Sequence, residues 1–411
     1  MMTQKSNLSA GREYLAIPGP SVIPDAVLQA MHRAAPNIYA GALPDMMPGL
    51  VADLRRVART RHHVAIYIGN GHAAWEAALA NVIGAGDRVL VPATGSFGHD
   101  WGDMAAGLGA EVETLDFGKA SAMDMARIGE ALKADRSHAI KAVLAVHVDT
   151  SSSVRNDIAA LRAVMDEAGH PALLMVDCIA SLGCDVFEMD DWGVDVMVTA
   201  CQKGLMVPPG MAFVFFNDKA GEVRRQMPRV SRYWDWTPRA APDLFYQYWN
   251  GTAPTHHVYG LRAALDMIHA EGIEAVWRRH EVLAHAIWAA CSAWGAGGSL
   301  AFNVAEPDAR SRAVTSLKLE SPQATALRDW TENQLGLTLG IGLGMATRGD
   351  PAWHGFFRLG HMGHINGHMI MGMLGGVDAG LKALDIPHGP GALEAASTVI
   401  ATGQLSAGAS E

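Results

Sequence analysis

Short, uninterrupted apolar segments alternate with stretches of helical periodicity between about residues 62 and 216. Because these segments are apolar throughout, they are typical of strands that are buried on both faces of a mainly parallel sheet. This alternation predicts an α/β fold with a mostly parallel sheet. Strands are expected over residues 64–68, 88–91, 142–147, 172–176, 195–199 and 211–216, and helices over residues 71–83 and 158–168.

The carboxyl-terminal part follows another pattern and predicts a smaller α+β unit. This unit is expected over about residues 295–387, with strands over 313–319 and 355–359 and a helix over 369–384. A long helix over 257–294, broken at 271–272, is expected before it. The segment after Gly389 is rich in Gly, Ser and Ala, which is typical of a poorly ordered terminus. The predicted division is an arm over 1–25, a large domain over 26–275, a small domain over 276–388 and a tail over 389–411.

The composition excludes a disordered chain and indicates a deep core. Of the 411 residues, 49% are hydrophobic and only 18% are charged, whereas a typical soluble domain has roughly 25% charged residues. A hydrophobic fraction of this size is sufficient to build a core. The low charge favours a surface that is partly covered by a second copy of the chain, and a large, well-buried monomer is the alternative.

Charge and hydropathy also exclude two kinds of partner. The chain has 42 acidic and 32 basic residues, a net charge of −10 and no dense run of Lys or Arg, so nucleic-acid binding is not expected. It has no apolar stretch long enough to cross a membrane, and its first dozen residues lack the apolar core of a signal peptide. The four cysteines show neither a CxxC pair nor a His/Cys metal pattern, which favours reduced thiols and a cytoplasmic location.

Lys203 is the first residue whose position indicates chemistry. It follows the expected strand 195–199 and precedes a Pro-Pro-Gly turn at 208–210. A lysine held in an apolar pocket has a lowered pKa and becomes a nucleophile toward carbonyl groups. The alternative is an ordinary solvent-exposed loop lysine.

Asp177 ends the expected strand 172–176, and it lies 26 residues before Lys203. A buried carboxylate needs a partner, which a helix N-terminus or a salt bridge would also provide. In pyridoxal phosphate enzymes, however, a lysine forms the Schiff base and an acidic residue pairs with the pyridinium nitrogen. The two residues together fit this cofactor.

A glycine-rich turn, residues 69–76 (GNGHAAWE), connects the expected strand 64–68 to a helix. Backbone N–H groups at a helix N-terminus form an anion site, especially where glycine lets the ligand approach closely. The segment is neither a GxGxxG dinucleotide motif nor a Walker A loop. A single phosphate group is therefore the expected ligand, although such a turn often has no ligand at all.

These pieces occur with others in a fixed order: residues 18–24 (PGPSVIP), 69–76, 176–183 (VDCIASLG), 200–204 (ACQKG) and 208–210 (PPG). Together they closely resemble class V aminotransferases of the alanine–glyoxylate and serine–glyoxylate branch, over residues 14–386. The resemblance implies the fold-type I of pyridoxal-phosphate-dependent transferases. It also implies a homodimer whose active sites are shared between subunits, with a tetramer as an alternative.

The resemblance assigns roles residue by residue. Lys203 resembles the Schiff-base lysine that carries the proton between the substrate Cα and the cofactor, and Asp177 resembles the partner of the pyridinium nitrogen. The other cofactor-binding residues that it implies are Gly71, His72 and Gln202 at the phosphate, Phe97 stacked on the ring, Thr150 near the 3′-oxygen or the substrate, and Thr252 and Trp249 at the phosphate, with Thr252 donated by the other subunit.

Arg358 resembles the small-domain arginine that grips the substrate α-carboxylate, a task that suits the planar guanidinium. Trp249 departs from the family, which usually has a tyrosine there. The segment 37–43 (NIYAGAL) also departs, because the serine–glyoxylate branch typically has a His-Arg-Ser segment near residue 38. Tyr39 and Gly41 are the residues expected at this side of the substrate entrance.

The implied reaction is a ping-pong transfer of an amino group from serine, alanine or aspartate to a small 2-oxo acid, first of all glyoxylate and otherwise pyruvate. The alternatives are an unusual amine donor of the ureidoglycine or pyridoxamine type, or a related lyase. A desulfurase needs a mobile loop cysteine, and the only cysteine after residue 201 is Cys291 in an apolar helical pattern. The histidines His361, His364 and His368 are expected to be helix or loop residues, and no metal is expected.

Overall fold

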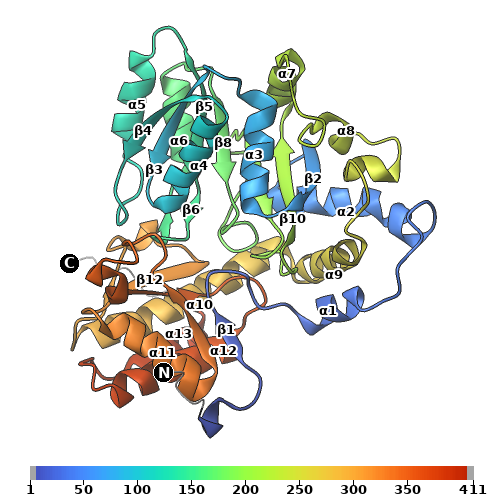
Figure 1. The fold of residues 1–411 in the computed structure, drawn as a ribbon. Helices are drawn as coiled ribbons and strands as arrows, with labels where there is room; N and C mark the ends of the chain where they lie inside the picture. Colours follow the sequence, from blue (N-terminus) through green and yellow to red (C-terminus); the bar gives the residue numbers. More distant parts are fainter. Residues whose placement is uncertain (1–5, 405–411) are drawn as a thin grey trace.

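The computed structural model describes residues 6–404, which fold around two β-sheets with helices on their faces (Figure 1). The larger sheet has the strand order β2-β10-β9-β8-β5-β3-β4. Only β10 is antiparallel to its neighbours in this sheet, so the predicted mostly parallel α/β sheet is confirmed. Its strands are β2 (His63–Gly69), β3 (Arg88–Ala93), β4 (Glu111–Asp116), β5 (Ile140–Val146), β8 (Leu173–Asp177), β9 (Val196–Ala200) and β10 (Gly210–Phe216).

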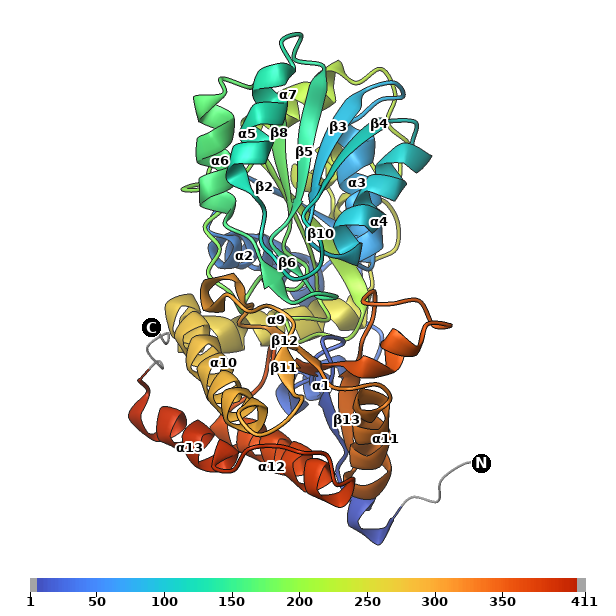
Figure 2. The same ribbon diagram turned by 90° about the vertical axis from the view of Figure 1, so that its left-hand side faces the viewer.

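Helices cover both faces of this sheet and bury its apolar side chains in two clusters. Figure 2 shows α5 and α6 on one side of the sheet and α3 and α4 on the other. The helices between β1 and α10 in the sequence are α1 (Asp25–Met31), α2 (Ala42–Ala58), α3 (Gly71–Val82), α4 (Ser96–Gly107), α5 (Met125–Ala134), α6 (Ile158–Glu167), α7 (Asp218–Gln226), α8 (Thr237–Ala240) and α9 (Thr255–Glu271).

One strand of the sheet, β4, was not predicted. It is the edge strand beside β3, and its residues are half-buried or exposed, without one fully buried side chain. Continuous apolar segments identify strands that are covered on both faces, and an edge strand that faces solvent does not show such a pattern. The central strands β5, β8 and β9 do, because nearly all of their residues are buried.

The smaller sheet has the order β1-β13-β14-β12-β11 and is mostly antiparallel. Its first strand comes from the amino-terminal arm and pairs in parallel with β13. The sheet therefore joins residues from both ends of the chain. Its elements are β1 (Tyr14–Ala16), β11 (Ala301–Phe302), β12 (Val314–Lys318), β13 (Leu337–Ile341) and β14 (Phe356–Gly360), covered by α10 (Ile273–Gly295), α11 (Gln323–Leu335) and α12 (Gly367–Ala383).

The predicted long helix over 257–294 is two helices, α9 and α10, and the break falls where the sequence placed it. Gly272 has φ 87°, a left-handed value that favours glycine. The first turns of α10 pack into the core of the large sheet, whereas the residues from Leu283 onward pack into the core of the smaller sheet. One helix thus connects the two units.

The expectation of a poorly ordered terminus was wrong for residues 392–402. They form α13 (Ala392–Thr402), which begins after Gly391 (φ 82°) and contributes Ala392, Ala396 and Val399 to the core of the smaller sheet. These three residues lie at helical spacing and form one apolar face, so burial against the small unit orders the segment. The last residues of the predicted tail, 405–411, lie outside the described part of the chain.

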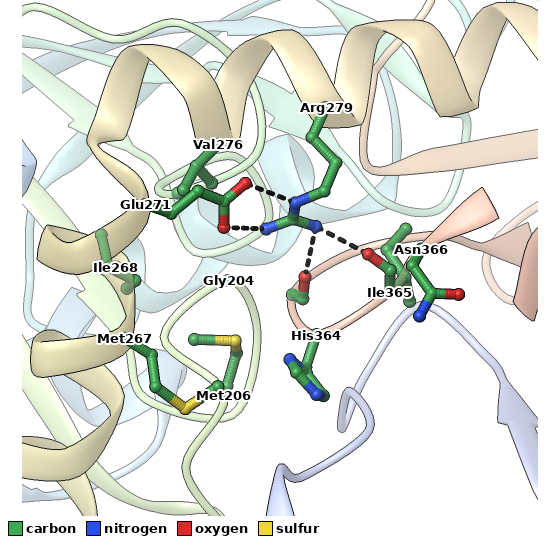
Figure 3. A pocket seen from close by; sticks show the side chains of 12 residues that line it. Gly204, Met206, Met267, Ile268, Glu271, Val276, Arg279, His364, Ile365 and Asn366 are labelled. Carbon is green, nitrogen blue, oxygen red and sulfur yellow. Dashed lines mark hydrogen bonds and ion pairs between the residues drawn. The ribbon is translucent and has the colours of Figure 1, made fainter. Parts of the chain in front are cut away.

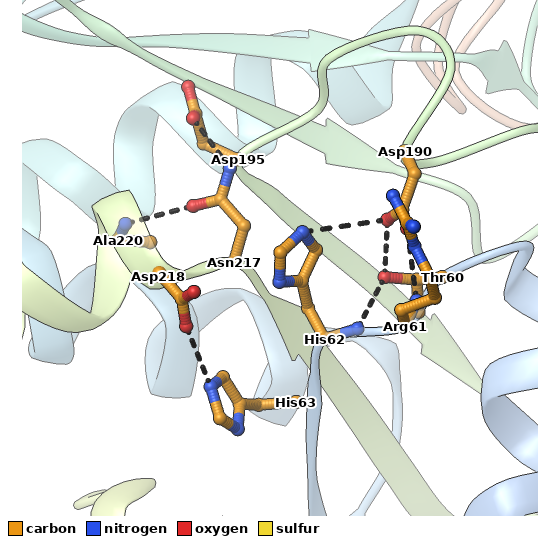
Figure 4. A network of polar contacts seen from close by, with 9 residues as sticks. All are labelled: Thr60, Arg61, His62, His63, Asp190, Asp195, Asn217, Asp218 and Ala220. Carbon is orange, nitrogen blue, oxygen red and sulfur yellow. Dashed lines mark hydrogen bonds and ion pairs between the residues drawn. The ribbon is translucent and has the colours of Figure 1, made fainter.

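A polar network fixes the loops at one end of the large sheet (Figure 4). Thr60 donates a hydrogen bond to Asp190 (2.6 Å), which also accepts one from the backbone of Arg61. Asn217 donates to Asp195 (2.9 Å) at the start of β9. These loops lie at the amino ends of the parallel strands, so the carboxyl ends carry the loops at the opposite edge. Among residues 6–404, no helix has the length and apolar character that crossing a bilayer requires.

Candidate active site

A cavity of about 240 Å³ lies at the carboxyl ends of the parallel strands. This is the edge at which open α/β sheets bind their ligands. Most of the residues that the sequence singled out follow strands β2, β3, β5, β8 and β9, and the fold therefore brings them together. The cavity is lined by seven predicted site residues: Gly71, His72, Phe97, Thr150, Asp177, Gln202 and Lys203.

Lys203 follows β9 and its side chain is half-buried. The Nζ atom donates a hydrogen bond to the backbone oxygen of Pro18, and the side chain lies against Gly19, where a Cβ atom would collide with it. Burial, followed by the charge of Arg358, lowers the pKa of Lys203 to about 8, although the charge of Asp177 acts in the opposite direction. The lysine is therefore a buried amine and not an exposed loop residue.

Asp177 ends β8, and its carboxylate faces the cavity with two protein partners. The Nε1 atom of Trp75 donates to one oxygen (2.9 Å) and the backbone N–H of Ile179 donates to the other (2.6 Å). Burial raises the pKa of Asp177 to about 7, although both hydrogen bonds favour the ionised form. A cation placed beside this carboxylate would restore its charge, which is the arrangement that a pyridinium N–H requires.

Trp75 is a site residue that the sequence analysis did not assign. It lies in the glycine-rich segment, four residues after Gly71, on the face of α3 that turns toward the cavity. Its ring packs at 6.1 Å edge-on to Phe97 while its N–H bonds to Asp177. The i, i+4 spacing from the predicted anion site was the available signal for this placement.

The start of α3 forms an anion site. Asn70 caps the helix, and its side chain and backbone oxygens accept hydrogen bonds from Ala73 and Ala74. The N–H groups of the first helical residues, Gly71 and His72, have no partner within the helix and face the cavity. A Cβ atom at position 71 would press on the side chain of Ile179, so glycine leaves the most room there. The positive end of the helix dipole adds to the preference for an anion.

Gln202 completes this side of the cavity. Its amide oxygen is buried and has no hydrogen-bond partner among the described residues. A buried amide atom without a partner is costly. With the amide turned over, its NH₂ group would take this place and donate to a phosphate. The helix start, the orphaned amide and the two buried groups Lys203 and Asp177 fit a cofactor that has a phosphate, a carbonyl carbon and a protonated ring nitrogen.

Arg358 lies on β14 and reaches the edge of the cavity at Thr150. Its Nη1 atom donates to the backbone oxygen of Thr150 and its Nε atom to that of Ile341, both at 2.7 Å. Within residues 6–404 its Nη2 atom has no hydrogen bond. Burial lowers the pKa of Arg358 to about 10, so the group keeps its charge at neutral pH. It is a buried cation whose two carbonyl partners leave one side of the guanidinium available to a carboxylate.

The loop that follows Arg358 is anchored beside a second cavity of about 270 Å³, between α9, α10 and residues 363–366 (Figure 3). Arg279 pairs with Glu271 (2.6 Å) and donates to the backbone oxygens of Gly363 and Ile365. The imidazole of His280 accepts the N–H of Gly363. Two consecutive residues of α10 thus hold both polar groups of Gly363, which fixes the loop after β14.

Besides Arg358, which reaches only its edge, four predicted site residues do not line the cavity of a single chain. Trp249 is buried in the core of the large unit. Thr252 is exposed, next to Gly251 with φ 154°. Tyr39 is 89% exposed. Gly41 is the N-cap of α2, with φ 91°, and a Cβ atom there would meet open space.

The three histidines after Arg358 do not gather around one point that could hold a metal. His361 is buried between the Thr315 hydroxyl and the backbone oxygen of Arg312. In the described part of the chain, no group of three or more His, Cys, Asp or Glu side chains is placed to bind a metal ion. Cys291 is buried in α10, where burial raises the pKa of its thiol. This placement does not fit the mobile nucleophile of a desulfurase.

The family described as aminotransferase class-V matches residues 13–342, which is most of the chain. The chain belongs to the class V aminotransferases. The family and the solved relatives of this fold use pyridoxal phosphate, and the cavity fits that cofactor, so the protein is a pyridoxal-phosphate-dependent aminotransferase.

Two curated relatives of this aminotransferase act with glyoxylate, according to their names. Serine–glyoxylate aminotransferase of Methylorubrum extorquens is 34% identical, with 94% of this chain and 96% of the relative covered. L-aspartate–glyoxylate aminotransferase of Paracoccus denitrificans is 32% identical, with 90% and 91% covered. The crystal structure of ureidoglycine–glyoxylate aminotransferase from Bacillus subtilis superposes with a TM-score of 0.85 at 25% identity, over 96% of this chain and 99% of that one.

The lowered pKa of Lys203 predicts how the cofactor-free aminotransferase takes up pyridoxal phosphate. Only the neutral amine attacks a carbonyl carbon, and its fraction rises about tenfold per pH unit below the pKa. With a pKa of about 8, the rate constant for covalent attachment should rise up to pH 8 and be constant above it. Stopped-flow absorbance between pH 6.5 and 10 measures this; a rate that keeps rising to pH 10 would show an unperturbed lysine.

Proposed function

We propose that this aminotransferase moves an amino group from a small amino acid to a small 2-oxo acid, with serine, alanine and aspartate as donors in that order and glyoxylate as the acceptor. The observation that carries the proposal is the buried Arg358, whose available side lies beside a cavity that also holds Lys203 and Asp177. The names of the relatives support glyoxylate as the acceptor.

We assign the steps of the reaction to the residues of the cavity. Pyridoxal phosphate, when bound, supplies an electron-withdrawing ring that stabilises charge at the substrate Cα. Arg358 holds the α-carboxylate of the amino acid and so orients the Cα–H bond. The Lys203 amine takes the proton from the substrate Cα and delivers it to the cofactor. Asp177 keeps the ring nitrogen protonated, and Gly71, His72 and Gln202 hold the phosphate. The 2-oxo acid binds after the first product leaves, in a ping-pong sequence.

Half-reactions with single amino acids test this proposal. The holoenzyme is mixed with L-serine, L-alanine or L-aspartate, without an acceptor, and the conversion of bound pyridoxal phosphate to its amino form is followed by absorbance. We expect rapid conversion with serine or alanine and slower conversion with aspartate, and then reversal on addition of glyoxylate. If only pyridoxamine or ureidoglycine gives conversion, the alternative of an unusual amine donor is correct. Release of ammonia from the amino acid, without conversion of the bound cofactor to its amino form, would favour a lyase.

We also propose that the enzyme is a homodimer whose sites are shared. Exposed apolar side chains lie close to the cavity. Ile68 is two residues before the cavity residue Asn70, and the hydroxyl of Tyr233 donates a hydrogen bond to the backbone oxygen of Ile68. Leu244 and Tyr246 are 57% and 49% exposed. They belong to the segment that leads to Thr252. A second copy that covers this surface would explain both the exposed apolar groups and the position of Thr252 outside its own cavity.

Hybrid dimers distinguish shared from separate sites. Lys203→Ala and Thr252→Glu are expected to be inactive as pure proteins, because the second variant places a negative charge beside the phosphate. In a dimer with one chain of each kind, one site has both defects and the other has neither. Random pairing should therefore restore about a quarter of the activity of the unaltered enzyme. Separate sites would leave the co-expressed, doubly tagged hybrids inactive.

A further inference from the structure

Asp149 is a buried carboxylate beside the cavity to which the reaction described above gives no role. It is fully buried and lies in β6 (Val148–Asp149), just before the cavity residue Thr150. One carboxylate oxygen accepts hydrogen bonds from the backbone N–H groups of Phe97 (2.9 Å) and Gly98 (3.2 Å). The other accepts from the backbone (3.0 Å) and the hydroxyl (2.5 Å) of Ser151. The group thus connects two loops of the site.

The first of these loops begins α4 and positions Phe97. Helix α4 has Gly95 at its N-cap, without a side-chain cap of its own. The carboxylate of Asp149, more than fifty positions along the chain, supplies that cap, and the helix dipole favours a negative charge there. A Cβ atom at Gly95 would collide with the carboxylate. The backbone of Phe97, whose ring lines the cavity, is therefore held by Asp149.

The second loop positions Arg358. Thr150 lies between Asp149 and Ser151, and its backbone oxygen accepts the hydrogen bond of Arg358 (2.7 Å). The Ser151 hydroxyl, which donates to Asp149, also accepts the N–H of Ser96 (2.9 Å), so the two loops are joined a second time. The negative charge of Asp149 also favours the charged form of the Arg358 guanidinium.

We propose that Asp149 is a positioning residue of the aminotransferase. It fixes the position of the Phe97 ring relative to the backbone carbonyl of Thr150. It thereby aligns the cofactor with the substrate carboxylate that Arg358 holds. The proposal rests on the assigned roles of Phe97 and Arg358. It requires both carboxylate oxygens as acceptors, because each faces two donors. An amide of the same shape has one acceptor oxygen, and its NH₂ group would face N–H or O–H donors on the other side.

The test compares Asp149→Asn with Asp149→Glu. The first variant keeps the size and loses one acceptor; the second keeps both acceptors and is one methylene larger. If positioning matters, Asp149→Asn should weaken pyridoxal phosphate binding by about tenfold and raise the KM of the amino donor by about 10- to 100-fold, as expected for buried donors left unsatisfied. The visible circular dichroism of the bound cofactor should fall, since that signal reports a fixed ring. Asp149→Glu should retain more of all three quantities than Asp149→Asn.

Asp195→Asn is the matched control. Asp195 is also buried and accepts a backbone N–H (Leu174, 2.8 Å) together with an Asn217 amide, but at the opposite end of the sheet. The Asp195→Asn substitution should lower the thermal unfolding temperature of the protein and leave its cofactor affinity, circular dichroism and KM unchanged.

Two outcomes would overturn the positioning role. The first is that Asp149→Asn leaves cofactor affinity and circular dichroism unchanged. The second is that Asp149→Glu lowers cofactor affinity and circular dichroism more than Asp149→Asn does, which would show that Asp149 only fills space. Cofactor affinity and dichroism are measured without substrate. They therefore test Asp149 even if the proposed amino donor is wrong. If the Asp149 variants behave as expected but serine, alanine and aspartate all fail as donors, only the proposed substrate is wrong.

Discussion

Replacing Lys203 by alanine is expected to reduce the turnover number by about 10³-fold or more and to remove the covalent attachment of pyridoxal phosphate. The variant lacks both the nucleophile that binds the cofactor and the base that moves the α-proton, and general acid–base catalysis alone contributes about 10²- to 10⁴-fold. The protein should still fold, because burial lowers the pKa of this lysine and a buried ammonium group does not stabilise the fold. Activity assays and absorbance after borohydride reduction measure the two effects.

Lys219→Ala is the control for this variant. Lys219 bonds to Asp195 and to the backbone oxygen of Ala172 at the other end of the sheet, far from the cavity, so its loss should leave cofactor attachment intact. Added methylamine should partly restore proton transfer to Lys203→Ala, because a small amine fits the space of the lost side chain. If Lys203→Ala still formed a reducible link with the cofactor, another lysine would be the attachment site.

The second large effect is expected from Arg358→Gln. A buried, hydrogen-bonded charge pair that loses one partner costs about 2–4 kcal/mol, so kcat/KM for α-amino acid donors should fall roughly 30- to 1,000-fold. The loss should appear mainly in KM, since the substrate carboxylate contacts Arg358 before and during the reaction. Steady-state kinetics with serine or alanine and a fixed concentration of glyoxylate measure the change.

The substrate itself supplies a control for this prediction. An amine donor without an α-carboxylate, such as ethanolamine, has no group for Arg358 and should react equally slowly with both enzymes. Arg224→Gln is the matched protein control, because this partly buried arginine of α7 pairs with Asp235 (2.7 Å) and is not among the residues that line the cavity. An equal loss for serine and ethanolamine would mean that Arg358 supports the structure and not the carboxylate.

The sequence predicted the central part of the fold because burial on both faces leaves a direct pattern. Strands β5, β8 and β9 were found as continuous apolar segments, and the break between α9 and α10 was found at Gly272. The edge strand β4 was missed because its residues are partly exposed. The order of segment 392–402 was also missed, because Gly, Ser and Ala in its surroundings hid the apolar face of α13. The domain boundaries stay a prediction.

The candidate site could be predicted only in part from the sequence. Lys203, Asp177 and Gly71 follow parallel strands, and the carboxyl ends of such strands meet at one edge of the sheet. Their approach was therefore implied by the order of the elements. The role of Trp75 follows from helix geometry once Gly71 is placed, but it needs the position of Asp177. Tyr39 and Thr252 do not line the cavity of this chain, and their roles stay predictions.

The sequence by itself determined the α/β class and the candidate residues of the site, because strand burial and the short motifs around Lys203 and Asp177 are local properties of the chain. Only the tertiary structure showed that the lysine is buried against Pro18 and that Arg358 meets Thr150 across the two units. It also revealed Asp149, whose partners lie more than fifty positions away in α4. Hydrogen bonds between distant segments leave no periodic signal in a sequence, and they exist only once the sheet brings the strand ends together.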